Sequence, residues 1–179
     1  NITAEAHQDM KGRRDILDVR GRVVSSAEAS LCCDADTTLA LASLHVDSLA
    51  GGRPTDVRFI RLALDDAEGR RVSDNFYVIG NEEGNLMQLH SLPKVSLKTD
   101  VVRDGNRYDV TITNETDTPA MMIRLNLKAE DGEQVLPVSY EDNYFHLMPG
   151  EKRTVRVEWN QADTRSLPTY VEMTGFNVK

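Results

Sequence analysis

Cysteine is scarce in this chain: the 179 residues contain only Cys32 and Cys33, and the two are neighbours. Adjacent side chains on an extended strand point to opposite faces and cannot easily close a disulfide on each other. A vicinal pair can bind soft metals or act in redox chemistry, but a partly buried pair on a strand is the simpler interpretation. We assign the pair no chemistry and infer no cellular compartment from it.

Long apolar runs and an excess of basic residues are also missing. No stretch approaches the 18 or so apolar residues that cross a bilayer, and no basic-then-apolar signal segment stands at Asn1. We therefore expect a soluble chain with no membrane partner. The formal net charge is −8, and Lys and Arg are spread among acids, which disfavours a nucleic-acid partner. A first residue other than Met suggests a piece cut from a longer parent.

The common enzyme signatures are absent from the sequence. There is no Gly-x-Ser-x-Gly elbow, no phosphate-binding Gly-Lys-Ser/Thr loop and no dinucleotide fingerprint. The four histidines show no ligand spacing such as His-x-x-x-His, so we expect neither a metal site nor a cofactor. These histidines are His7, His45, His90 and His146.

Acidic residues are plentiful, and a glycosidase needs two carboxyl groups flanking the scissile bond. Most of the candidates fall in predicted hairpin turns, where acids are favoured because they solvate well and form local hydrogen bonds. We therefore predict no catalytic residue in this chain. The turn acids are Asp65, Asp66, Glu68, Glu130 and Asp131.

Aromatic platforms that stack on sugar rings are few. Trp159 is the only tryptophan, and it lies in the alternating run Val155-Val157-Trp159, whose odd positions look like a core face. Core packing is therefore favoured over ligand contact for Trp159. Tyr140 and Tyr170 are weaker candidates for ligand binding.

The feature that is present is a long internal repeat. Three landmarks recur at an offset of 63 residues (60 to 123, 69 to 132, 72 to 135), and a fourth recurs at 68 (74 to 142), so five residues are inserted after the third. This predicts a duplicated domain, although convergence on one hairpin pattern is an alternative. The landmarks are Ile60–Leu64, Gly69, Val72 and Asp74–Tyr77, and then Ile123–Leu127, Gly132, Val135 and Asp142–Phe145.

The repeated Asp-Asn-aromatic-aromatic segment appears in both copies, whereas a catalytic site is normally needed once. We therefore predict a structural role, in which a carboxylate or amide caps backbone N–H groups and an aromatic ring packs inward.

Alternating apolar residues predict strands throughout the chain. Residues 1–11 have no sustained period and are expected to be a poorly ordered lead-in, or else the remnant of a strand that belongs to an absent neighbour. The first half is predicted to have strands at 16–24 and 38–49 and a hairpin made by 57–64 and 71–78. The second half is predicted to have seven strands, at 95–101, 108–113, 121–127, 134–140, 144–147, 154–159 and 170–178.

Seven short strands at this spacing are typical of an immunoglobulin-like sandwich. The predicted fold is all-β, with two tandem immunoglobulin-like antiparallel β-sandwiches at 1–92 and 93–179. It is left open whether the first is truncated at its N-terminal part.

Several segments of the second half together resemble the C-terminal immunoglobulin-like domain of glycoside hydrolase family 2 enzymes, of the β-mannosidase and exo-β-glucosaminidase type. In that group two sandwich domains follow a catalytic (β/α)₈ barrel, and the earlier one ends in a segment similar to 60–77. The resemblance covers most of the chain from Asp56 onward and is weak before it. The segments that carry it are Pro119–Leu127, Gly132, Val135–Val138, Asp142–Phe145 and Leu147–Glu151.

The resemblance implies that the catalytic glutamates belong to a barrel that this chain lacks, because such a barrel needs about 250 residues. It implies a non-catalytic accessory part of an exo-β-glycosidase, with the barrel and neighbouring domains as partners. A carbohydrate-binding module that takes an oligosaccharide is the alternative, and a cell-surface adhesion module is a weaker third hypothesis. Export to the periplasm or the medium is expected for such an enzyme.

Overall fold

The computed structural model describes residues 3–41, 56–80 and 84–179. The chain separates into two compact units, Asn1–Ser91 and Leu92–Lys179, next to the predicted boundary at residue 92. Across these described ranges the regular elements are β-strands and two short 3-10 helices, η2 (Met87–Ser91) and η3 (Gln161–Thr164). The all-β prediction is confirmed.

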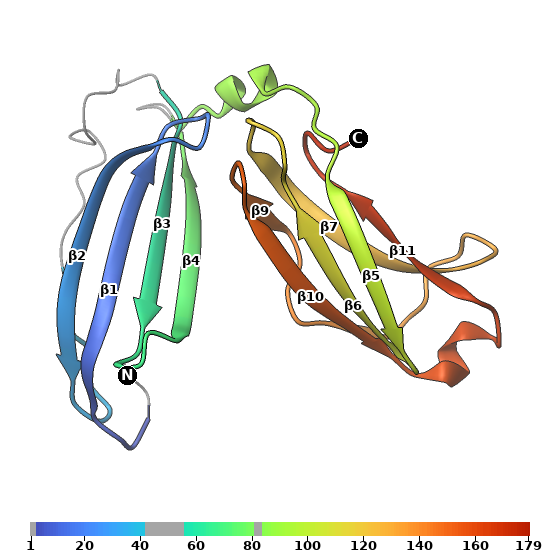
Figure 1. Cartoon of the computed structure of the whole chain (residues 1–179), viewed down its shortest axis with the longest axis horizontal. Helices are drawn as coiled ribbons and strands as arrows, with labels where there is room; N and C mark the ends of the chain where they lie inside the picture. Colours follow the sequence, from blue (N-terminus) through green and yellow to red (C-terminus); the bar gives the residue numbers. More distant parts are fainter. Residues whose placement is uncertain (1–2, 42–55, 81–83) are drawn as a thin grey trace. The chain divides into compact units, whose positions relative to one another are not determined.

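The first unit is built on one antiparallel sheet of four strands in the order β2-β1-β3-β4. Figure 1 shows these strands side by side in a single layer. β1 pairs with β2 and β3, and β3 pairs with β4. Their bounds are β1 (His7–Leu17), β2 (Val23–Cys33), β3 (Arg58–Asp65) and β4 (Arg71–Ile79).

The two hairpins of this sheet use one turn sequence, Asp-x-x-Gly-Arg. In the β3–β4 turn, the N–H of Asp66 donates to the carbonyl of Arg70 at 2.9 Å, and Gly69, at φ 80°, donates to the carbonyl of Asp66. The Asp66 carboxylate also accepts the backbone N–H groups of Glu68 and Arg70, and the latter bond is the main cause of its lowered pKa. The same bonds recur between Asp18 and Arg22. The hydrogen bonds of the turns therefore explain why Asp18 and Asp66 occupy these positions, and no catalytic role is needed to explain them.

Two predictions in the first half were wrong. The predicted strand 16–24 spans the β1–β2 turn, because Val19, Val23 and Val24 continue an apolar pattern across it. The expected irregular lead-in 1–11 is partly strand, since β1 begins at His7. Of the predicted strand 38–49, residues 38–41 are not strand and the rest lies outside the described residues.

The second unit is a sandwich of two sheets, as predicted. One has the order β5-β6-β10-β8 and the other β11-β7-β9 (Figure 1). The strands of the first sheet are β5 (Lys98–Asp104), β6 (Arg107–Thr113), β10 (Lys152–Trp159) and β8 (Val138–Tyr140). Those of the second are β11 (Thr169–Thr174), β7 (Ala120–Ala129) and β9 (Phe145–Leu147).

The core of the second unit lies between these sheets. β6 and β10 bury every second residue, and their cross-strand pair Val110 and Val155 is fully buried. From the opposite sheet, Ile123 and Leu125 of β7 join the same cluster. Full burial of one such side chain is worth about 1.5–3 kcal/mol, so this alternation is what selects the sandwich.

Four of the seven predicted strands differ from the structure: 95–101 is displaced to β5 (Lys98–Asp104), 144–147 begins one residue later as β9, and two others are clearly shorter than expected. Strand 134–140 is reduced to β8, because Pro137 has no N–H to contribute to a sheet. Strand 170–178 ends as β11 at Thr174, and Val178 instead forms a parallel bridge with Val95.

The duplication is visible in strand register. Ile60 of β3 pairs with Tyr77 of β4, and Ile123 of β7 pairs with Phe145 of β9; these positions are related by the offsets 63 and 68. The turn also repeats: Ala129, Gly132 and Glu133 make the bonds that Asp66, Gly69 and Arg70 make in the first unit. The shared geometry supports duplication of a whole hairpin.

Candidate functional site

One face of the first unit's sheet is apolar and concave. Strand alternation and register place Leu62 across from Arg14 and Asn75, and Leu64 across from Gly12 and Ser73. On β2, small side chains continue this face, and Leu41 contributes from the segment after β2. The resulting hollow has a volume of about 380 Å³. The β2 residues that line it include Ala27 and Ala29.

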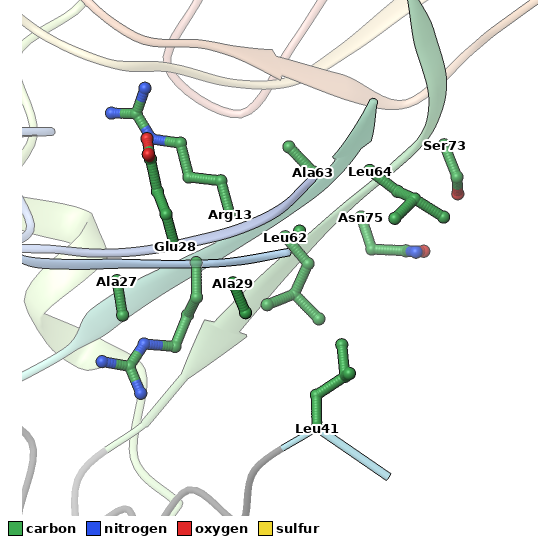
Figure 2. A pocket seen from close by; sticks show the side chains of 12 residues that line it. Arg13, Ala27, Glu28, Ala29, Leu41, Leu62, Ala63, Leu64, Ser73 and Asn75 are labelled. Atoms are coloured by element: carbon green, nitrogen blue, oxygen red, sulfur yellow. The ribbon is translucent and has the colours of Figure 1, made fainter. Parts of the chain in front are cut away.

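Figure 2 shows Leu41, Leu62, Ala27 and Ala29 on this side of the sheet, with Arg13 and Glu28 directed to the other side. Leu41 is 57% exposed. In the described part of the first unit, the four strands form one sheet and no second sheet covers this face. The second sheet of the sandwich predicted for residues 1–92 is therefore not found among the described residues, and these strands leave the apolar side of the sheet uncovered.

The opposite face carries charges that are paired. Asp15 is 4% exposed and accepts hydrogen bonds from Arg13 Nε at 3.0 Å and from Ser26 Oγ at 2.6 Å. The hydrogen bond to Asp15 raises the pKa of Arg13. Near one end of the face, Phe59 packs against Phe76 with ring centroids 5.4 Å apart. The carboxylate of Asp15 is therefore paired by neighbours on the same sheet.

Trp159 lies in the core of the second unit, in line with its alternating pattern. It is 7% exposed, and its ring lies 4.8 Å from that of Tyr108. Arg103 covers the pair, 5.8 Å from the tryptophan ring centroid. The tryptophan is a packing residue and offers no open platform to a sugar.

The two tyrosine candidates lie apart from Trp159. Tyr140 is half-buried, and its hydroxyl accepts the N–H of Leu127 at 2.8 Å. Burial raises the pKa of Tyr140, opposed by that hydrogen bond and by Arg124. Tyr170 is 44% exposed and lies on β11 opposite Lys128.

A second hollow, of about 580 Å³, lies beside Tyr140 on the second unit. Tyr144, which is 55% exposed, lines it together with Arg124 and Asn143. Neither Trp159 nor Tyr170 lines it.

Tyr144 was missed by the sequence reasoning, which treated it as part of a structural repeat. The expected inward ring belongs to Phe145, which is 5% exposed, and the capping group is the amide of Asn143. The five-residue insertion before this segment was the available signal, because it breaks the strand that the first copy forms there. In the first copy Asn75 lies inside β4, opposite Leu62. The backbone groups at that position are paired by the neighbouring strand, so no side-chain cap is needed there.

The remaining candidates show no assembled chemistry. Cys32 and Cys33 are free thiols at the end of β2, and Cys33 Sγ lies 3.5 Å from the Thr37 hydroxyl. Among the residues placed by the structure, no group of three or more His, Cys, Asp or Glu could hold a metal ion. Helices long and apolar enough to cross a membrane are likewise not found in the described ranges.

Comparison with known proteins identifies the family. The family model of the exo-beta-D-glucosaminidase Ig-fold domain matches residues 75–178, more than half of the chain. The chain belongs to this family. The resemblance of the sequence to glucosaminidase and mannosidase type Ig-like domains is thereby confirmed.

Individual relatives agree with the exo-beta-D-glucosaminidase Ig-fold assignment. The chain is 30% identical to the exo-beta-D-glucosaminidase of Arthroderma benhamiae over an alignment 186 residues long, which covers 92% of this chain and 20% of that protein. Its fold is similar to the exo-chitosanase CsxA of Amycolatopsis orientalis, with a TM-score of 0.72 at 21% identity over 99% of this chain and 24% of that one. Its fold is also similar to the beta-D-mannosidase of Dictyoglomus thermophilum, with a TM-score of 0.63 at 20% identity over 99% of this chain and 19% of that one.

The chain spans about a fifth of the length of the curated relatives it matches. An exo-beta-D-glucosaminidase Ig-fold domain of this extent is thus a small part of a larger multidomain protein in those relatives.

Proposed function

We propose that this chain is a non-catalytic accessory part of an exo-acting β-glycosidase of the glucosaminidase and mannosidase type, and that it packs against the rest of that enzyme and stabilises it. The observation that carries the proposal is the apolar face around Leu62 and Leu64, over which the described part of the first unit places no second sheet. An antiparallel sheet with one apolar face needs a second layer to bury it.

The occupant of that face is the remaining polypeptide of the parent enzyme. The relatives are about five times longer than the matched segment, so most of such an enzyme lies outside this chain. The surface of this hollow is mainly apolar, although Arg14, Ser73 and Asn75 also line it, so it suits side chains from a neighbouring domain better than a sugar.

The test uses one double variant, Leu62→Ser with Leu64→Ser, and compares its effect in the isolated chain with its effect in the parent enzyme. In the isolated chain, where both leucines are partly buried, we expect the smaller loss of stability. In the parent enzyme, each leucine should be fully buried, and the double variant should lose about 3–6 kcal/mol of unfolding free energy. Denaturant titration followed by circular dichroism measures both, and loss of glycosidase activity is a second readout for the parent enzyme alone.

Leu136→Ser is the matched control, because Leu136 is 65% exposed on the second unit. This substitution should change the unfolding free energy of the isolated chain, and that of the parent enzyme, by no more than about 0.5 kcal/mol. Equal losses in the isolated chain and in the parent would contradict the packing role. Hydrolysis of a chromogenic β-glucosaminide by the purified chain would contradict the non-catalytic part of the proposal.

A further inference from the structure

The hollow beside Tyr140 lies where the duplicated hairpin departs from a regular strand pair. In the first unit β4 runs unbroken along β3. In the second, the chain opposite β7 is divided between β8 and β9, and β8 pairs with β10 of the other sheet. The opening that this leaves has a volume of about 580 Å³.

The floor of this opening is held by side chains that replace a strand. Asn143 accepts the N–H of Leu125 at 2.8 Å and donates to its carbonyl at 3.0 Å. The Tyr140 hydroxyl accepts the N–H of Leu127, and the carbonyl of Leu127 accepts the N–H of Val135. Because these backbone groups are satisfied, the floor is fixed before any ligand arrives.

One wall is an aromatic ring held at the surface by a rare backbone conformation. Tyr144 has φ 60°, a left-handed value that is uncommon for a bulky residue, and its N–H donates to Asn143 Oδ1 at 3.1 Å. The guanidinium of Arg124 lies 5.9 Å from the ring centroid. The corresponding residue of the first copy, Phe76, lies in regular β4 and packs against Phe59. The second copy has turned the equivalent ring outward.

Polar groups surround this ring. The lining includes the side chains of Arg124, Asn126, Gln134 and Ser139 as well as Tyr140. A phenol that accepts one hydrogen bond still has its own O–H to donate. An exposed ring beside amide, hydroxyl and guanidinium groups offers a stacking surface for the C–H face of a sugar and partners for its hydroxyls.

We propose that Tyr144 and the polar side chains around it form a binding site for a pyranose unit that carries no positive charge. Arg124 lies at the ring face, so a cationic amino sugar would be repelled there. The site shares no lining residue with the packing face on the first unit.

The experiment is calorimetric titration of the whole chain with N,N′-diacetylchitobiose, with mannobiose and with the corresponding diglucosamine, at a pH where the diglucosamine amines are protonated. We expect one of the two uncharged sugars to bind with millimolar affinity, and the diglucosamine to bind roughly tenfold more weakly. No binding of either uncharged sugar overturns the site, and equal binding of diglucosamine overturns its charge preference.

Tyr144→Asn locates the site, because Asn tolerates left-handed φ and the variant should fold at least as well as the parent sequence. We expect it to weaken sugar binding by roughly tenfold or more. Tyr144→Phe, which keeps the ring, should retain most of the affinity. Tyr170→Ala removes an exposed tyrosine outside the hollow and should leave binding unchanged. Undiminished binding by Tyr144→Asn would overturn the assignment.

Discussion

The side-chain amide of Asn143 binds both backbone groups of Leu125, with its oxygen on the N–H at 2.8 Å and its nitrogen on the carbonyl at 3.0 Å. A neighbouring strand makes the same two bonds with its own backbone. In this unit one amide therefore takes the place of one strand residue at the edge of β7.

Asn143→Ala should destabilise the chain by about 2–4 kcal/mol, because it leaves a backbone N–H and a carbonyl of buried Leu125 without their partner. Urea unfolding measures the loss. Asn75→Ala changes the equivalent residue of the first copy, whose backbone pairing does not depend on its side chain. That control should move stability by no more than about 0.5 kcal/mol, and a loss as large as that of Asn143→Ala would refute the distinction.

His146 should make stability depend on mildly acidic pH. Burial lowers its pKa to about 4, with Arg153 adding to the fall and Asp142 opposing it, and its Nδ1 accepts the N–H of Met122. Because the unfolded pKa is about 6.5, the folded chain prefers the neutral ring; its contribution is complete above that pH and is lost as pH falls from about 6.5 to 4. The full contribution is about 3 kcal/mol.

Unfolding free energies of the natural chain and of His146→Asn, measured across this pH range, isolate the effect. The asparagine can still accept from Met122 but does not titrate, so the difference between the two curves should shrink as the solution is acidified. Parallel curves would show that His146 is not the group responsible. Carboxylates that titrate nearby affect both proteins alike.

Asn177→Ala should lower the free energy of unfolding by about 3 kcal/mol. This residue is 2% exposed, and its side chain accepts the N–H of Met121 and donates to the carbonyls of Pro93 and Pro119, so one amide ties the end of the chain to two other segments. Thermal and denaturant unfolding give the magnitude. Asn160→Ala removes an exposed cap of η3 and should cost only about 1 kcal/mol, which sets the scale for a single surface bond.

Tyr144→Asn should leave stability unchanged or raise it. A non-glycine residue in a sparsely populated backbone region carries roughly 1–3 kcal/mol of strain, and asparagine relieves part of it. The loss of the Arg124 contact offsets about 0.5–1 kcal/mol of the gain. A clear fall in melting temperature would show that the exposed ring supports the fold, and would remove strain as an argument for function.

Much of the fold could be predicted because the turn residues and the alternation of apolar with polar residues indicate the same strands. The β3–β4 hairpin was predicted from Asp65–Gly69 between two alternating runs, and Trp159 was predicted as core from its strand parity. The β1–β2 hairpin was missed although Asp18 and Gly21 form the same turn, since apolar residues on both sides kept the alternation intact. Alternation reports exposure along a strand and carries no information on where the strand reverses.

The candidate sites were less accessible to sequence reasoning. The apolar face depends on the register of β1 with β3, which brings Gly12 opposite Leu64 across 52 positions of sequence. The role of Tyr144 depends on a left-handed φ, for which its residue type gives no signal. Both are consequences of pairing between distant segments, and the repeat itself led the interpretation of Tyr144 toward structure.

Replacement of a strand by two side chains also changes what can vary over evolutionary time. A continuous strand fixes the length and register of everything between its ends, so one inserted residue turns every later side chain to the other face. Here Tyr140 and Asn143 reach β7 through single side-chain contacts, and between Val135 and Asn143 the chain forms no continuous strand with β7. The length and composition of this segment can change while the core beneath stays intact, which would allow related domains to alter the shape of this opening without refolding.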